Sequence, residues 1–190
     1  GATDLAAVLP LLAALALIER SSFWCGLCVG LSIATKLLPG AAMLPALIPA
    51  SRRDLFVAGI LVGLLPILPF AAWGPQDFWG NIVLFNLSRL PDSTSWLRTM
   101  PGSVASAAHL VFTAAMLATA IHVLHRKPTV MARAMLAAML GIAAILAGPG
   151  AHHNYQLWWL PFYALALALA LAPEGRVGYI NAAEFAAKEA

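Results

Sequence analysis

The run Leu55–Trp73 contains no charged side chain and is about as long as a membrane-spanning helix, which needs about 20 apolar residues. Ser103–Leu124 and Thr129–Ala147 are of similar length. Arg133 lies one turn inside the last of these and is expected to snorkel outwards. A soluble domain carries about 25% charged residues, whereas this chain of 190 residues has 10% charged and 62% hydrophobic residues. The sequence therefore predicts an integral membrane protein and excludes a disordered chain, a nucleic-acid-binding domain and an ordinary cytosolic enzyme.

Two shorter apolar stretches complete the predicted set of membrane segments. Leu5–Ile18 is expected to be a clipped or tilted first segment, and Leu157–Ala172 carries Trp158 and Trp159 where an interfacial aromatic belt would anchor it. The prolines within Leu55–Trp73 are expected to kink that helix. The predicted fold is an all-α, polytopic helical bundle of about 6–7 membrane segments over residues 1–172, followed by a cytoplasmic tail over residues 173–190.

The stretch Phe23–Ala50 is not predicted to form one straight helix. Such a helix would place Lys36 near the bilayer centre, at a cost of about 2.5–3.5 kcal/mol, and the stretch contains several prolines. We expect two short helices, Phe23–Thr35 and Ala41–Ala50, that meet at a break near Lys36–Gly40. Broken helices at membrane depth are found where they pack within protein or line a cavity, so the break marks a candidate site.

The basic residues predict an orientation in the membrane. Arg52-Arg53 and Arg126-Lys127 are the two basic clusters, and helix alternation places both on one side, which the positive-inside rule makes cytoplasmic. Asp4, the break at Lys36, and the loops 74–102 and 148–156 then face outwards. The outer loop 74–102 is expected to begin with an interfacial amphipathic helix over Asp77–Leu87.

Three outward-facing cations suit an anionic headgroup. Lys36 would supply a point charge, and Arg89 and Arg98 would each offer a bidentate fork to phosphate oxygens. Two simpler interpretations stay open: the arginines are solvated loop charges, or the lysine snorkels to the interface.

His152 and His153 are candidate catalytic residues at the entrance of the last helix. Adjacent imidazoles there could be a general base, hydrogen-bond donors to a leaving group, metal ligands, or an interfacial structural pair. No cluster of Cys, His or carboxylate lies beside them in the sequence, and Cys25 and Cys28 are too few for a disulfide framework or a four-ligand zinc site. We therefore predict no metal and no cofactor, and expect both cysteines to be small packing residues.

Two blocks of residues resemble a known family. Gly26 and Gly30 followed by Leu31-Ser32-Ile33-Ala34-Thr35-Lys36-Leu37-Leu38-Pro39, and later by Arg52-Arg53, resemble the "G-LA--K--P … RR" block of glycosyltransferase family 87. Gly148–Pro161 is similar to the "HH--W--P" block that opens a late helix in that family. Its members are polyprenol-phosphate-mannose-dependent mannosyltransferases of the GT-C superfamily, and the chain corresponds to the C-terminal half of one.

The resemblance implies a hexosyltransferase of the plasma membrane, in a bacterial cell envelope, that moves mannose from a polyprenyl-phosphate donor to a glycolipid or glycan acceptor. It implies an extracytoplasmic active face and a GT-C-like bundle. Lys36 would face the donor phosphate, and His152 or His153 would border the reaction centre. Asp4 and Tyr155 are possible contacts to the donor or acceptor. The catalytic Asp of the family lies in an outward loop that would precede Gly1. The chain departs from the family pattern at Gly1–Asp4, where the family often reads "GQ-N", and only loosely matches its "N-S" element near Arg89.

One other class of function stays open from the residues alone. A polytopic lipid or polysaccharide transporter, a flippase or a ligase could share the outward-facing cations without using a glycosyl-phosphate donor. An outward loop with one or two Asp upstream of Gly1 would favour the glycosyltransferase. Its absence would favour the alternatives.

Overall fold

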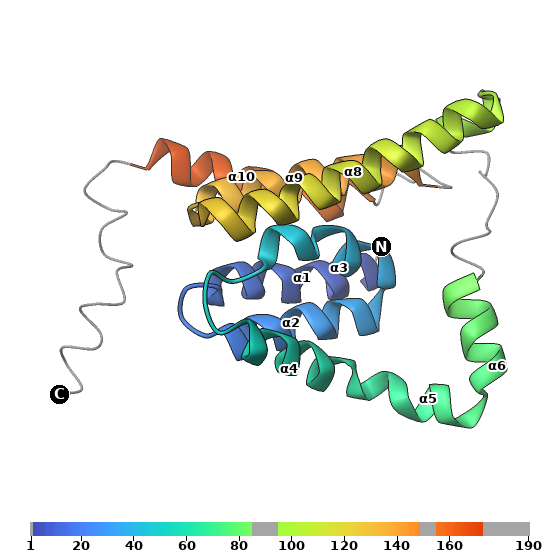
Figure 1. Ribbon diagram of the computed structural model, residues 1–190, viewed down its shortest axis with the longest axis horizontal. Coiled ribbons are helices and arrows are strands. Elements are labelled where there is room, and N and C mark those ends of the chain that lie inside the picture. The colour runs from blue at the N-terminus through green and yellow to red at the C-terminus, as the bar shows by residue number, and fades with distance from the viewer. Residues whose placement is uncertain (1, 85–94, 149–154, 173–190) are drawn as a thin grey trace.

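The computed structural model describes residues 2–84, 95–148 and 155–172, and over these residues the chain is helical and contains no strand (Figure 1). The all-α prediction is confirmed for this part of the chain. Three segments are long and apolar enough to cross a membrane: Arg53–Trp73, Gly102–Arg126 and Val130–Ala147. The count of 6–7 membrane segments stays a prediction, and the predicted tail, 173–190, lies outside the described residues.

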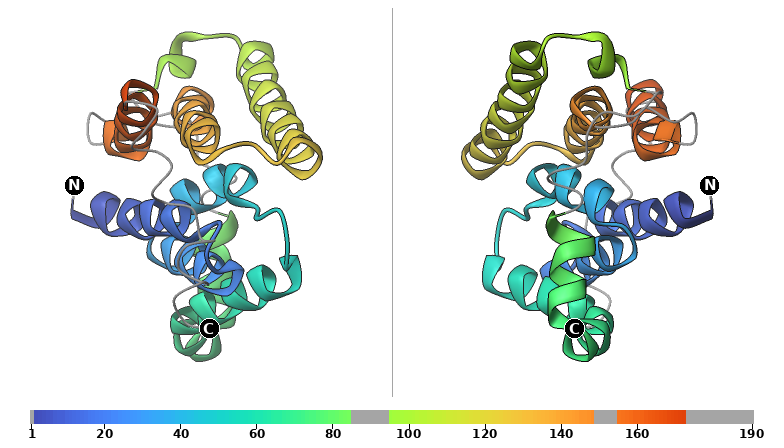
Figure 2. Two further views of the ribbon diagram at one scale, coloured as in Figure 1. Left: turned by 90° about the vertical axis from the view of Figure 1, so that its left-hand side faces the viewer. Right: turned by 90° about the vertical axis from the view of Figure 1, so that its right-hand side faces the viewer.

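One layer of the structure contains α1 (Ala2–Leu17), α2 (Ser22–Thr35) and α4 (Arg53–Leu64). A tight turn reverses the chain between α1 and α2, and Ser21 begins α2 because its side-chain oxygen accepts a hydrogen bond from the Trp24 backbone N–H. Figure 2 shows this layer facing a second one, with a short segment between them. The N-terminus of α1 and the C-terminus of α2 consequently lie at the same end of the bundle.

The helices α2 and α4 pack backbone against backbone through paired glycines. A Cβ atom added at Gly26 would lie 2.0 Å from the carbonyl oxygen of Phe56, and one added at Gly59 would lie 2.1 Å from that of Phe23. Small residues four apart allow such close approach in membranes, where burial of apolar surface gives little drive for association. The spacing of Gly59 and Gly63 in the sequence was a signal of this contact that our sequence analysis missed.

The predicted break is confirmed at Lys36, which has an extended backbone (φ −155°, ψ 115°) between α2 and α3 (Leu37–Met43). The second helix begins at Leu37 rather than Ala41, and its 3-10 continuation η1 (Leu44–Leu47) ends before Ala50. Pro39 permits the early start because the first N–H groups of a helix have no acceptor within it. The segment α3–η1 runs back between the two layers (Figure 2).

The helix that starts with α4 is kinked, as its prolines predict. It passes through a 3-10 turn, η2 (Leu65–Ile67), into α5 (Leu68–Trp73), and then into α6 (Pro75–Phe78) and a π-helical turn, η3 (Trp79–Leu84). The start of the predicted helix Asp77–Leu87 is thus helical. Beyond α4, the segments α5 and α6 extend away from the other helices in Figure 1, and Trp73 at the end of α5 is 95% exposed.

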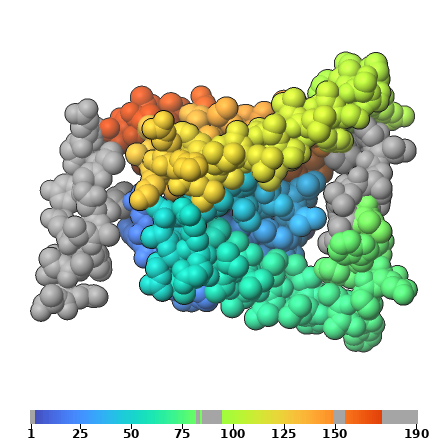
Figure 3. Space-filling model, in the orientation of Figure 1, coloured from blue at the N-terminus to red at the C-terminus, as the bar shows by residue number. Residues whose placement is uncertain are grey.

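The second layer contains α8 (Gly102–Arg126), α9 (Val130–Ala147) and α10 (Gln156–Leu171). A 3-10 turn, η4 (Trp96–Thr99), precedes α8, and the side chain of Thr129 caps α9 by accepting from the Ala132 N–H. In Figure 3, α8 runs along the outside of the molecule. Its exposed Leu and Val side chains suit contact with lipid.

The buried core lies between the two layers. It is formed by large apolar side chains from both layers and from α3–η1, namely Leu11, Leu15, Val29, Met43, Leu47, Trp158 and Phe162. Small alanines of α9 fill the space beside them. This core fixes α3–η1 in place, so the residues at its two ends occupy defined positions.

Candidate functional site

A buried ion pair stands at the break between α2 and α3. Lys36 Nζ donates to Asp4 Oδ1 at 2.5 Å. Asp4 lies in the first turn of α1 and is 1% exposed, whereas the side chain of Lys36 is 27% exposed. The N-terminus of a helix carries a partial positive charge, so the first turn of α1 and Lys36 both attract the carboxylate of Asp4.

Two aromatic rings at the start of α10, Trp158 within it and Tyr155 at its N-cap, complete this site. Trp158 Nε1 donates to the same Asp4 Oδ1 at 2.8 Å, and Tyr155 stacks on Trp158 with 4.4 Å between ring centroids. Lys36 Nζ lies 4.8 Å from the Tyr155 centroid and 5.3 Å from that of Trp158, within the range of a cation–π interaction. We call Asp4, Lys36, Tyr155 and Trp158 the Lys36 site.

The Lys36 site can present a positioned cation to an anion. Lysine carries three donor hydrogens, and a single one of them is needed for the bond to Asp4. The carboxylate oxygen that receives Lys36 and Trp158 serves to position the ammonium group. Because about a quarter of the Lys36 side chain is exposed, the ammonium group can also reach a ligand that approaches from this end of the bundle.

Three of the sequence-predicted site residues meet here: Asp4, Lys36 and Tyr155. Among the other predicted site residues, only Arg98 lies in the part of the chain that the structure describes. Arg98 lies on the exposed side of η4, and the remaining candidates, His152, His153 and Arg89, lie outside the described residues.

Trp158 is a site residue that sequence reasoning placed elsewhere. It was expected in an interfacial aromatic belt, but it is 1% exposed and bonds to a carboxylate in the core. A buried indole N–H requires an acceptor, and Asp4 supplies it. The spacing of Tyr155 and Trp158, one helical turn apart, was the available sign that both rings face the same partner.

The turn η4 and the residue before it, Ser95, are hydrogen-bonded to the C-terminal end of α9. Ser95 Oγ donates to the carbonyl oxygen of Gly148 at 3.1 Å, and Trp96 Nε1 donates to that of Leu146 at 2.6 Å. Leu146 belongs to the last turn of α9 and Gly148 is its C-cap, and carbonyls at a helix C-terminus have no donor within the helix. These bonds hold Arg98 at the end of the molecule where the chain passes from α9 towards α10.

Arg133 is a correction to the sequence analysis. It does not snorkel outwards: it is 3% exposed, and its Nη1 donates to the carbonyl oxygens of Ala46 at 3.1 Å and Ile48 at 2.7 Å. Its Nε donates to the Pro128 carbonyl oxygen at 3.0 Å. The end of η1 leaves carbonyls that need donors, and the guanidinium group supplies several at once.

The cysteines behave as packing residues. Cys25 is buried, with its Sγ 3.7 Å from the Leu47 carbonyl oxygen, and neither Cys25 nor Cys28 forms a disulfide. Within the described part of the chain, no group of three or more His, Cys, Asp or Glu side chains is placed to hold a metal ion.

Comparison with known proteins identifies a family. The family model of Glycosyltransferase family 87 matches residues 1–149, which include α1, the break at Lys36 and α9. The late block that begins at Gly148 lies almost entirely beyond the matched residues. Neither the curated proteins nor the solved structures contain a match to the chain.

Proposed function

We propose, since the chain belongs to glycosyltransferase family 87, that it is a membrane mannosyltransferase of the GT-C type. In this proposal it transfers a hexose from a polyprenyl-phosphate donor to a glycolipid or glycan acceptor on the extracytoplasmic side of the plasma membrane of a bacterium. The family indicates glycosyltransferase activity, and the apolar helices fit a membrane protein. The observation that carries the choice of donor is the cation held at the helix break.

Lys36 would bind the donor phosphate and stabilise it as the sugar departs. Negative charge develops on the leaving phosphate in the transition state, and a cation fixed in position beforehand stabilises that charge without reorganisation. Asp4 is then a positioning residue because its carboxylate is already bonded to Lys36 and Trp158. The base that deprotonates the acceptor hydroxyl would be an Asp in a loop upstream of Gly1.

The remaining predicted residues would surround this centre. His152 and His153 would border the reacting groups, and Tyr155 would contact the donor or acceptor from its place beside Lys36. Arg89 and Arg98 would add further cations for the phosphate. Support for Arg98 comes from η4, which is attached to the last turn of α9.

The distribution of charge supports the proposed orientation. Arg20, Arg52 and Lys127 line one pocket, which lies at the far end of α1 from Asp4. The positive-inside rule would make that end cytoplasmic, so the Lys36 site would open on the other side. In this proposal α1, α2, α3–η1, α4–α5, α8, α9 and α10 are the membrane segments, including one short broken pair.

The test removes the charge of Lys36 from the full-length protein without leaving a lone buried carboxylate. Lys36→Met alone would strand the carboxylate of Asp4, which is destabilising, so we pair it with Asp4→Asn/Lys36→Met. We expect both variants to lose transfer by about 100-fold or more, and the double variant to fold as well as the wild type. The measurement is transfer from a polyprenyl-phosphate sugar in membranes, per amount of folded protein.

Arg53→Gln is the matched control because it removes one exposed positive charge at the opposite end of the molecule. It should leave transfer unchanged. Turnover within a few-fold of wild type in the folded double variant would contradict the role of Lys36. Movement of a lipid or polysaccharide by the wild type, without any sugar transfer, would contradict the glycosyltransferase proposal and support the transporter alternative.

A further inference from the structure

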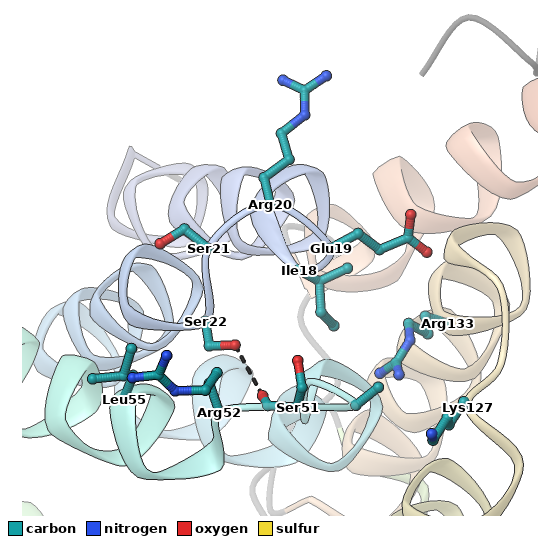
Figure 4. Close-up of a pocket in the computed structure, with 11 residues that line it drawn as sticks. Ile18, Glu19, Arg20, Ser21, Ser22, Ser51, Arg52, Leu55, Lys127 and Arg133 are labelled. Carbon is teal, nitrogen blue, oxygen red and sulfur yellow. Dashed lines mark hydrogen bonds between the residues drawn. The ribbon is translucent and has the colours of Figure 1, made fainter. Parts of the chain in front are cut away.

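The pocket lined by Arg20, Arg52 and Lys127 lies at the opposite end of the bundle from the Lys36 site (Figure 4). It has a volume of about 490 Å³, which is within the range of ligand pockets. Its polar lining includes four cationic side chains and one carboxylate, namely Arg20, Arg52, Lys127, Arg133 and Glu19. Nothing in the proposed transfer reaction uses this pocket.

The cations come from four separate segments of the chain. Arg20 follows α1, Arg52 precedes α4, Lys127 follows α8, and Arg133 belongs to α9. Segments far apart in the sequence therefore contribute like charges to the lining of one space, but the guanidinium group of Arg20 points away from it (Figure 4). Like charges repel each other, so such a cluster favours an anionic ligand that offsets the repulsion.

The backbone gives a second and independent observation. Arg52 (φ 48°) and Lys127 (φ 47°) are the two non-glycine residues with positive φ in the part of the chain that the structure describes. Both are in the left-handed helical region, which is unfavourable for residues with a Cβ atom, and both line this pocket. Lys127 has this conformation as the residue that ends α8, where it is common. Arg52 lies just before α4, and strain of this kind is found at ligand-binding sites.

The charges facing the pocket are only partly compensated. Arg52 Nε lies 3.8 Å from Asp54 Oδ1, but both side chains are mostly exposed, so this pair is weak. Arg133 gives its Nε and Nη1 to neutral backbone carbonyls, so its charge is not cancelled by those bonds. Figure 4 shows Arg133 and Lys127 directed towards the space, with the Ser22–Ser51 hydrogen bond across from them.

We propose that this pocket binds the phosphate group of an anionic phospholipid, separately from any sugar donor. The pocket lies at the end of apolar helices, where lipid headgroups are found, and Ile18 and Leu55 add apolar walls to its polar lining. Basic pockets between membrane helices are known to suit anionic headgroups. A soluble phosphate compound offers the same charged group, and the experiment separates the two sources.

The experiment uses the full-length protein in nanodiscs of neutral phosphatidylcholine, with or without phosphatidylglycerol. The variant Arg52→Gln/Lys127→Gln changes two exposed lining residues, so its folding should be preserved. The control Arg53→Gln/Arg126→Gln removes the same charge at the adjacent positions, neither of which lines the pocket. Lipid retained per protein is counted by native mass spectrometry, and thermal unfolding is recorded for each disc.

We expect phosphatidylglycerol to raise the unfolding temperature of the wild type and of the control, because a ligand that binds the folded state stabilises it. The lining variant should retain at least five-fold less phosphatidylglycerol and lose most of the temperature shift. A shift produced by millimolar inorganic phosphate in neutral discs, and lost in the lining variant, would support the same pocket with a soluble ligand. Equal retention and equal shifts in the two double variants would overturn the proposal.

Discussion

The segment α3–η1 has a cation at each end, and the two cations differ in what they bind. Arg133, at the end of η1, is 3% exposed and donates to the backbone carbonyls of Ala46, Ile48 and Pro128. Lys36, at the start of α3, is 27% exposed and donates to the carboxylate of Asp4. One end is therefore fixed by bonds to the backbone, and the other by a bond between side chains.

This difference separates a structural contact from a candidate site. The donors of Arg133 that bond to carbonyls satisfy groups that would otherwise be buried without partners, so the main contribution of these bonds is to the fold. Lys36 is held by a side chain at the edge of solvent, where its ammonium group can share hydrogen bonds with a ligand. Both cations keep α3–η1 between the layers, but Lys36 is placed to act on a substrate.

The strongest test of the comparison is Arg133→Met. It leaves the carbonyls of Ala46 and Ile48 without their donor, at about 1–3 kcal/mol for each buried group, so we expect a loss of about 4 kcal/mol in the free energy of unfolding. Thermal unfolding in detergent and the fraction of monodisperse protein measure this loss. Arg126→Met, which changes an exposed arginine at the end of α8, is the control and should change stability little. Equal stability of the two variants would show that the carbonyl bonds of Arg133 do not hold η1.

A second test acts on the Lys36 end through α2. Gly59→Ala places a methyl group where the carbonyl oxygen of Phe23 is 2.1 Å away, and backbone cannot move aside as a side chain can. We expect α2 to be displaced from α4, with a loss of about 3 kcal/mol. Gly102→Ala is the matched control, since a Cβ atom there meets no atom within 4 Å. Thermal unfolding of both variants measures the effect, and a stable Gly59→Ala protein would show that the two helices can separate freely.

The sequence predicted features that depend on neighbouring residues, but it did not predict contacts between residues far apart in the chain. The break at Lys36 was predictable because a lysine at membrane depth and nearby prolines both act within one segment of chain. The partner of each cation was not predictable from the sequence. Arg133 meets Ile48 across 85 positions of sequence, and Trp158 meets Asp4 across 154. Apolar periodicity indicates that a helix has a buried face, but it does not say which backbone carbonyl or carboxylate that face will meet.

The glycine pairs of α2 and α4 also show that the sequence does not identify which segments meet. The pair Gly26 and Gly30 was visible in the sequence, and so was the pair Gly59 and Gly63. Each pair allows a second helix to pack closely, but neither pair indicates which helix that is. Only the structure shows that the two pairs face each other, with Gly63 Cα 2.9 Å from the position of a Cβ atom at Gly30. The glycine spacing was thus a signal of close helix packing that our sequence analysis did not use, and only the structure shows where the contact occurs.

The smallest expected effect is that of replacing Arg98, which tests whether the fixed position of Lys36 determines activity. Arg98 is a cation predicted for the same phosphate, but it lies on an exposed turn, whereas Lys36 is bonded to a buried carboxylate. Exposed charge pairs contribute about 0.2–1 kcal/mol, so Arg98→Gln should raise the donor KM by no more than about five-fold and leave kcat close to wild type. Steady-state transfer with varied donor measures both constants.

A loss as large as that of Lys36→Met would show that charge at this end, rather than its fixed position beside Asp4, determines activity. A small loss confined to KM would mean that the buried carboxylate matters because it holds one cation in place before the donor arrives.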